Sequence, residues 1–266
     1  MMLPVPRTAD RKGRHDQCTE PVDRRHPDAG TGSLVTFDGD VITKLHRPGT
    51  DPQKLTERLR VADRLDCLLS PLSMKPELAE GRWRTRWPRV EVVAQDPRRL
   101  PWGEAGRVLA ELHREPVGDL CVPHGSLGRL ARALDRLHEG PVADVIRRAA
   151  GRLEFSGELR TVVHGDFHLG QLGWDGRSWV LIDVDDLGVG DPRWDLGRPA
   201  GFWAAGLIPD AEWYAFLDGY RAAGGPALPA GDPWPALEAC ARAAVIGAAA
   251  SHPDDELLVD ACARMS

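Results

Sequence analysis

Residues 162–171 read VVHGDFHLGQ, and the stretch LID that follows ends at Asp183. A run of β-branched residues leads into a segment with Gly165 and Gly170, which favours a strand that runs into a loop over a helix. Two histidines and one carboxylate in this loop are compatible with a metal site, with acid–base catalysis or with a hydrogen-bonded turn. The rest of the sequence is needed to decide among these three.

A zinc site would use His164 and His168, which have the spacing of the two histidines in H-E-x-x-H. That motif needs a helix to place both side chains on one face, whereas this segment is predicted to be a loop. No glutamate follows His164, and the sequence offers no evident third ligand. Zinc, and with it a metal hydrolase, is therefore the least favoured interpretation.

An isolated H-G-D tripeptide is typical of a turn whose side chains bond their own backbone. Here, however, Asp166 ends one predicted strand and Asp183 ends the next, and we expect a hairpin to bring the two carboxylates to one edge. Close carboxylates are unfavourable unless a cation or a shared proton relieves their repulsion. Mg²⁺ chelated with substrate phosphates would do so, because it needs only a few protein oxygens.

Composition and charge exclude several classes of partner. The chain has 266 residues, 42% hydrophobic and 28% charged, as in ordinary soluble globular proteins. No apolar run approaches the ~18 residues that a membrane-spanning helix needs, so no membrane partner is expected. A formal net charge of −6 argues against nucleic acid. The five cysteines lack a C-x-x-C pair and are widely spaced, which favours reduced thiols and a cytoplasmic location.

The pattern along the chain predicts an α+β protein in three parts. Residues 1–30 are interpreted as a polar leader, residues 31–98 as a small β-rich N-lobe, and residues 99–266 as a larger helical C-lobe entered through a connector near 95–102. The N-lobe elements are expected at 33–37, 41–45, 51–69 and 84–94. The C-lobe helices are expected at 103–115, 127–139, 141–153 and beyond 192, with strands at 160–163 and 179–184. In the helix 127–139 the residues expected to face the core are Leu127, Leu130, Leu134 and Leu137.

Three blocks occur in order in the C-lobe: HGDFHLGQ, LIDVDD and GDPRWDLG, the last at 190–197. Together they resemble the core of the aminoglycoside phosphotransferase and choline kinase-like family. The resemblance is tightest over residues 161–200. It implies a two-lobed protein-kinase-like fold, and transfer of the γ-phosphate of ATP or GTP to a hydroxyl group of a small molecule with Mg²⁺ as cofactor.

The resemblance also implies roles for single residues. Asp166 would orient the acceptor hydroxyl and accept its proton. Asp183 would bind Mg²⁺, and Lys44 would pair with the α- and β-phosphates of the nucleotide. Asp195 and His164 would hold the catalytic loop in place. The alternative for Lys44 is a solvent-facing lysine in a strand.

Gln171 stands where the family usually has Asn. Both amides offer a carbonyl oxygen to a metal, so we assign Gln171 with Asp183 to the metal site; the alternative is a metal site that this residue impairs. Glutamine at this place resembles the sugar-kinase branch of the family, which favours a sugar or amino-sugar acceptor. His168 and Asp185 are further candidate site residues without an assigned role.

The nucleotide side carries weaker signals. Gly30, Gly32 and Ser33 precede the first strand and are candidates for a loop whose N–H groups cover phosphates. Glu57 is a candidate partner of Lys44. On a helical wheel, however, Glu57 falls nearly opposite the apolar face of its helix, which favours a solvent-facing side chain.

The acceptor side is expected in the helical C-lobe. Aromatic residues and carboxylates there suit an amino sugar, although aromatics at helical spacing are more often core residues. Trp194 is the tryptophan expected nearest the catalytic edge. The carboxylates considered are Asp210, Glu212, Asp218, Asp254, Asp255 and Glu256.

Two functions follow from these residues. The first is a Mg²⁺-dependent small-molecule kinase whose partners are a nucleotide and an aminoglycoside, amino-sugar or sugar-like acceptor. The second is a catalytically silent kinase-like module that binds nucleotide or protein, which the incomplete glycine loop and the uncertain Glu57 favour. The sequence does not indicate the oligomeric state.

Overall fold

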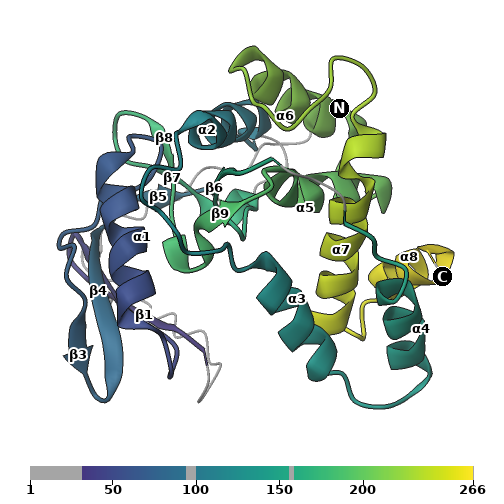
Figure 1. The fold of residues 1–266 in the computed structure, drawn as a ribbon, viewed down its shortest axis with the longest axis horizontal. Helices are drawn as coiled ribbons and strands as arrows, with labels where there is room; N and C mark the ends of the chain where they lie inside the picture. The colour runs from purple at the N-terminus through teal and green to yellow at the C-terminus, as the bar shows by residue number, and fades with distance from the viewer. Residues whose placement is uncertain (1–31, 94–99, 156–158, 266) are drawn as a thin grey trace, which may run out of the picture.

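The structure is a computed structural model that describes residues 32–93, 100–155 and 159–265. The expected leader 1–30, with Gly30, lies outside the described residues, as do residues 94–99 of the expected connector. Figure 1 shows a small sheet with one helix at one end of the molecule, and helices gathered along the top and at the other end. In the described residues no helix is long and apolar enough to cross a membrane.

The small sheet has four antiparallel strands in the order β1-β2-β4-β3. The D-G turn closes the predicted hairpin, since Asp38 pairs with Val41 and Gly39 takes the positive φ of 55° that the turn requires. The predicted extended region supplies β4 and β5. The bounds are β1 (Leu34–Asp38), β2 (Val41–Leu45), β3 (Glu77–Ala79), β4 (Arg82–Pro88) and β5 (Glu91–Val92).

Helix α1 (Pro52–Arg64) lies beside this sheet in Figure 1. Asp51 caps it by accepting hydrogen bonds from the N–H groups of its first turn, and Pro52 occupies the first helical position, as expected. The prediction that the helix continues to residue 69 is wrong. The chain turns extended at Leu65, because the backbone around Leu68 pairs with Leu181 of strand β8 (Trp179–Leu181).

The catalytic-loop region is built differently from the predicted single hairpin. Strand β6 (Thr161–Val163) pairs with β9 (Gly188–Gly190) and not with β8. Strand β8 pairs instead with β7 (Leu172–Trp174), and β7 also pairs with β5. The expectation that Asp166 and Asp183 end two adjacent strands is therefore wrong; two short helical turns, η1 (Leu169–Gln171) and η2 (Val184–Asp186), carry the chain between these strands.

Helices form the rest of the molecule. Helix α2 packs against α6, and α5 packs against α7. The side chain of Leu127 in α3 is 49% exposed, so the expectation that it faces the core is wrong, whereas Ala133 and Leu137 are buried. The bounds are α2 (Trp102–Arg114), α3 (Ser126–Asp135), α4 (Pro141–Ala150), α5 (Arg193–Ala204), α6 (Asp210–Ala222), α7 (Trp234–Ser251) and α8 (Glu256–Met265).

The close approach of α2 and α6 depends on glycine. A Cβ at Gly106 would lie 2.2 Å from the carbonyl oxygen of Phe216, whereas one at Gly103 would have its nearest neighbour at 3.6 Å. We expect Gly106→Ala to lower the free energy of unfolding by about 1–2 kcal/mol, because backbone overpacking exceeds the gain in helix propensity. Gly103→Ala is the matched control and should be neutral or stabilising. Urea unfolding measures both, and equal effects of the two changes would contradict this explanation.

Candidate active site

The loop after β6, which carries the HGDFHLGQ motif, is held by Asp195 of α5. The Asp195 carboxylate, 1% exposed, accepts hydrogen bonds from the backbone N–H groups of His164 (2.7 Å) and Gly165 (2.8 Å). His113 of α2 donates to the same carboxylate at 3.0 Å and is hydrogen bonded to Tyr220. Burial opposes the charged form, but these hydrogen bonds hold the pKa of Asp195 below its usual value. A buried carboxylate therefore fixes the start of the loop.

His164 links this loop to the segment that carries Asp183. Its ring is fully buried, and Nε2 donates to the carbonyl oxygen of Ile182 at 2.8 Å. Nδ1 accepts from the N–H of Asp166 at 3.3 Å, which fixes the tautomer with the proton on Nε2. Both ring nitrogens are thus engaged, so His164 is not available as a metal ligand.

Glycine at 165 permits the close crossing of the two segments. Its φ is 82°, and a Cβ there would lie 2.2 Å from the carbonyl oxygen of Asp186. The G in H-G-D is therefore required both by the backbone conformation and by the neighbouring chain.

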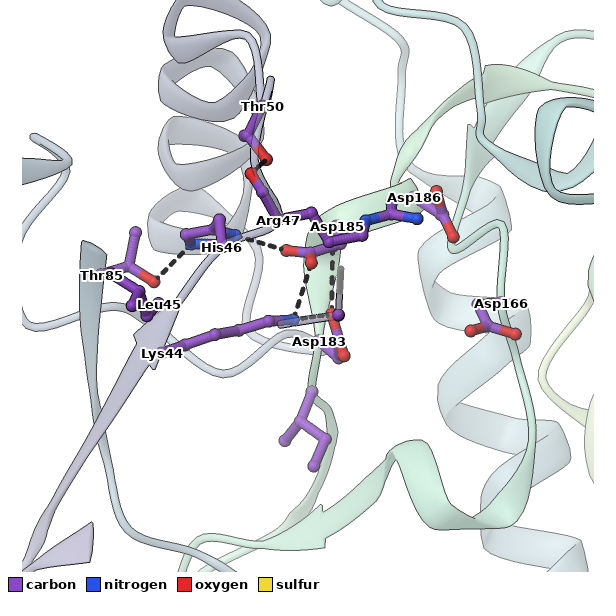
Figure 2. Close-up of polar contacts among 12 residues, drawn as sticks. Lys44, Leu45, His46, Arg47, Thr50, Thr85, Asp166, Asp183, Asp185 and Asp186 are labelled. Atoms are coloured by element: carbon purple, nitrogen blue, oxygen red, sulfur yellow. Dashed lines mark hydrogen bonds and ion pairs between the residues drawn. The ribbon is translucent and has the colours of Figure 1, made fainter. Parts of the chain in front are cut away.

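Lys44 reaches from β2 to the LIDVDD segment. Its Nζ lies 2.6 Å from an oxygen of Asp183 and 2.9 Å from one of Asp185, as Figure 2 shows. Burial would lower the pKa of Lys44, but the two carboxylates raise it overall. The alternative of a solvent-facing lysine is wrong, since Lys44 is buried.

Asp185 is itself held by a buried chain of side chains that sequence reasoning missed. His46 Nδ1 lies 3.0 Å from Asp185, and its Nε2 is hydrogen bonded to Thr85 at 2.8 Å. Trp87 donates to the same hydroxyl at 2.9 Å. Burial opposes ionisation of Asp185, yet Lys44 and His46 lower its pKa. The available signal was the spacing of Lys44 and His46, which are two positions apart at the end of β2, because alternate strand positions share a face.

The metal donors expected at this point are Gln171 and Asp183. The backbone of Gln171 pairs with Ile182, which places it beside Asp183. No hydrogen bond of the Gln171 side-chain amide is found within the described residues, and one oxygen of Asp183 faces Lys44 while the other has no such contact. Asp183 also has a φ of 62°, an uncommon conformation for a non-glycine residue that recurs at functional sites. A carboxylate and an amide oxygen are hard donors that fit Mg²⁺.

The remaining zinc candidates do not converge. His168 Nδ1 accepts from the N–H of Gly170 at 3.1 Å, and burial together with nearby Arg198 lowers the pKa of His168 to about 3. Within the described ranges no group of three or more His, Cys, Asp or Glu residues is placed to hold a metal ion. His168 therefore acts as a cap for η1 in this structure.

Asp166 lies between two arginines that the sequence did not single out. Arg129 of α3 forms an ion pair with one of its carboxylate oxygens, and Arg198 of α5 lies 3.7 Å from the other. Arg129 also pairs with Asp186 at 3.1 Å and donates to the carbonyl oxygen of Gly165. The helical spacing of arginines in α3 was the signal that could have identified Arg129.

Two adjoining cavities surround these residues. The large cavity, of about 990 Å³, is lined by Lys44, Asp166, Asp183 and Asp185, and reaches Ser33 and Val35. The small cavity, of about 270 Å³, lies between α3, α5 and α7 and includes Asp166 and Trp194. Asp166 and Asp183 come from separate segments, as Figure 2 shows, yet they line one space.

The other predicted residues lie as follows. Ser33 lines the large cavity, while the carbonyl oxygen of Gly32 accepts a hydrogen bond from Arg82. Glu57 is half-buried and not solvent-facing, and its Oε2 is buried with no hydrogen-bond partner in the described part of the chain. Lys44 pairs with Asp183 and Asp185, and no contact with Glu57 is found there.

The aromatic and acidic residues expected to bind an acceptor lie elsewhere. Trp213 and Phe216 are core residues. Asp210 accepts a hydrogen bond from Trp203, and Glu212 accepts one from Trp102, so both carboxylates serve the packing of helices. Of that set, Trp194 alone lines the small cavity beside Asp166.

The support of Lys44 by His46 and Asp185 can be tested. We expect His46→Gln and Asp185→Asn each to weaken binding of a Mg²⁺–nucleotide complex about tenfold, the effect of one charge-assisted hydrogen bond. The double variant should be no weaker than the worse single variant, because both changes loosen the same lysine. Titration calorimetry with Mg²⁺ and ADP measures these affinities. Fully additive losses would show that His46 and Asp185 act independently.

Several solved structures of kinases and phosphotransferases superpose on this protein. The choline kinase of Streptococcus pneumoniae superposes with a TM-score of 0.60 at 12% identity, over 91% of this chain and 91% of that one. A thermostable mutant of an aminoglycoside phosphotransferase gives 0.60 at 14%, over 90% of each chain. Spectinomycin phosphotransferase, solved with ADP and spectinomycin, gives 0.55 at 14%, over 88% of this chain and 81% of that one. None of the curated proteins compared with the chain matched it significantly.

At these identities the superpositions show the fold, and they confirm the two-lobed protein-kinase-like architecture predicted from the sequence. The sequence itself matches the model of the phosphotransferase enzyme family over residues 33–234. That match covers most of the chain and includes Lys44, the catalytic loop and the LIDVDD segment. The protein therefore belongs to the phosphotransferase enzyme family.

Proposed function

We propose that the protein transfers the γ-phosphate of ATP or GTP to a hydroxyl group of a small, sugar-like acceptor, with Mg²⁺ as cofactor. The observation that carries the proposal is that Lys44, Asp166 and Asp183 line one cavity. Phosphoryl transfer needs little covalent chemistry from the protein; it needs positioning and charge stabilisation at such a set of groups.

Asp166 is assigned to the acceptor. Arg129 holds one of its carboxylate oxygens, so the other, Oδ1, is assigned to the acceptor hydroxyl. There it orients the hydroxyl and takes its proton as the bond to phosphorus forms. Asp195 and His164 keep the loop that carries Asp166 in place through the contacts described above.

Lys44, Asp183 and Gln171 are assigned to the nucleotide. Lys44 binds phosphate oxygens with its ammonium group still held by Asp185, and it exchanges its contact with Asp183 for them. Gln171 and Asp183 would hold Mg²⁺, which neutralises charge on the phosphates. Ser33 lies on the same cavity wall and is assigned to the phosphate-covering loop.

The N-lobe, which would carry the nucleotide, is proposed to extend from residue 31 to residue 98.

The donor and location are supported indirectly. Spectinomycin phosphotransferase has been solved with ADP and also with AMP, which favours an adenine nucleotide. GTP is retained as the second donor to be tested. Among the described residues Cys67, Cys121 and Cys240 are free thiols, in agreement with a cytoplasmic protein.

A screen of nucleotide consumption tests this function. Purified protein is incubated with Mg²⁺, with ATP or GTP, and with a panel of sugars, amino sugars and aminoglycosides. We expect acceptor-dependent nucleotide consumption that a chelator abolishes. Absence of Mg²⁺-dependent nucleotide binding would overturn the proposal. Tight nucleotide binding without turnover of any acceptor would favour the silent module instead.

A further inference from the structure

Arginines dominate one wall of the large cavity. Arg129, Arg132 and Arg136 follow one another three and four residues apart, so they share one face at the end of α3. All three line the cavity, and Arg47, directly after β2, lines it from the other side. Arg132 and Arg136 are exposed to this cavity, whereas Ala133 and Leu137 beside them are buried, and α3 packs on α7.

Most of these guanidinium groups form no ion pair, although carboxylates also line the cavity. Arg129 pairs with Asp166 and Asp186. Within the described residues no ion pair is formed by Arg47, Arg132 or Arg136. Burial and the neighbouring guanidinium groups lower the pKa of Arg132, and the opposing effect of Asp186 does not outweigh them. Like charges at this spacing are unfavourable in a helix, so their concentration in a cavity indicates a site for an anion.

The small cavity has the same sign of charge. Asp166 is the one carboxylate among its described lining residues, and Arg129 and Arg198 lie on two sides of it. The guanidinium of Arg198 is further held over the ring of Phe202, 5.2 Å from its centroid. A cationic acceptor would meet two arginines there and no free carboxylate.

We propose that the acceptor carries an anionic group, a carboxylate or a phosphate, and that Arg132 and Arg136 bind it while Asp166 receives the hydroxyl. The proposal rests on the proposed function and narrows its acceptor class. Guanidinium groups suit it because their planar N–H donors pair with two oxygens of a carboxylate or phosphate at once. The nucleotide phosphates have their own partners in Lys44 and the metal donors. The charge of the acceptor is then opposite to that of the amino sugar favoured by Gln171.

A binding experiment tests the site without turnover. The protein is first saturated with Mg²⁺ and a non-hydrolysable ATP analogue, so that the γ-phosphate position is filled. Glucosamine, glucose, glucuronate and glucose 6-phosphate, which differ mainly in charge, are then titrated, with inorganic phosphate as a further probe. We expect an anionic compound to bind more tightly than glucose, and glucosamine to bind less tightly. Glucuronate against glucose 6-phosphate distinguishes a carboxylate from a phosphate.

Variants connect this preference to the arginines. Arg132→Gln and Arg136→Gln should each weaken binding of the preferred anion about tenfold or more, and raise its KM with a smaller change in kcat, as expected for the loss of a charge-assisted hydrogen bond. The affinity for the Mg²⁺–nucleotide analogue should stay within about twofold. Arg148→Gln is the matched control, since Arg148 is an exposed arginine of α4 outside both cavities.

Three results would overturn the inference. These are tightest binding of glucosamine, no anion bound more tightly than glucose, and equal loss of nucleotide affinity in the Arg132 and Arg136 variants, which would assign these arginines to the nucleotide. The proposed function can fail separately. If anions bind through Arg132 but no acceptor is phosphorylated, the site stands without the activity; if glucosamine is phosphorylated, the activity stands without the site.

Discussion

Asp166→Asn is expected to lower kcat by about 10²- to 10⁴-fold, the range that a general base contributes. Asparagine keeps the shape of the side chain and an oxygen for Arg129, but it cannot take the proton of the acceptor hydroxyl. The structure brings Asp166 to the cavity from a different segment than Lys44 and Asp183. The affinity for the Mg²⁺–nucleotide complex should therefore change little.

Steady-state kinetics with the best acceptor of the panel, together with calorimetry of nucleotide binding, measures both quantities. Asp218→Asn is the matched control, because Asp218 is an exposed carboxylate of α6 remote from both cavities. Undiminished turnover by the Asp166 variant would show that the catalytic base is another group. Loss of nucleotide binding would instead place Asp166 at the nucleotide.

Asp195→Asn is expected to destabilise the fold by about 3 kcal/mol, because the change removes a buried charged acceptor and leaves its donors unsatisfied. Asp195 accepts from His113 and from two backbone N–H groups, and an amide cannot accept all three while its own NH₂ group faces donors. The loop that carries Asp166 should loosen with it, so activity should fall as well.

The contribution of Asp195 to the free energy of unfolding should depend on pH in a definite direction. The pKa of Asp195 is lowered in the folded protein. Its contribution to stability is therefore complete above the unfolded pKa of about 3.9 and is lost as the pH falls through the lower folded pKa. Urea unfolding of wild type and variant should differ most at neutral pH and converge in acid. A constant difference across this range would show that the Asp195 charge is not what stabilises the loop.

The features that could be predicted from the sequence are those that depend on a few neighbouring residues. The D-G hairpin, the cap at Asp51 and the β-branched run before Gly165 correctly placed β1, β2, the start of α1 and the loop after β6. The pairing of β7 with β8 is a local hairpin around the D-G turn at Asp175-Gly176, but β7 had not been assigned as a strand from the sequence. The pairing of β6 with β9 was not predicted, because it depends on long-range packing and not on local propensity. The same cause ended α1 early, since backbone pairing with β8 outweighs the helical periodicity of the leucines.

Side chains that contact a distant segment of the chain were also missed from the sequence. Arg129 belongs to a helix that periodicity explains by its apolar face alone, yet a polar residue beside that face supplies the ion pair to Asp166. His46 resembles any residue of a strand end, and its contact with Asp185 exists only after the two lobes meet. Such contacts follow from the assembled fold, which a single sequence does not specify by pattern.

The central claim is phosphoryl transfer to an acceptor hydroxyl at Asp166. The most direct test is to incubate the protein with Mg²⁺ and ATP labelled in the γ-phosphate, in the presence of the acceptor panel, and to follow the label into the acceptor. The account predicts a labelled acceptor with the wild type, and loss of the label with Asp166→Asn or without Mg²⁺. Label found only in inorganic phosphate, or transfer that survives in the Asp166 variant, would contradict it.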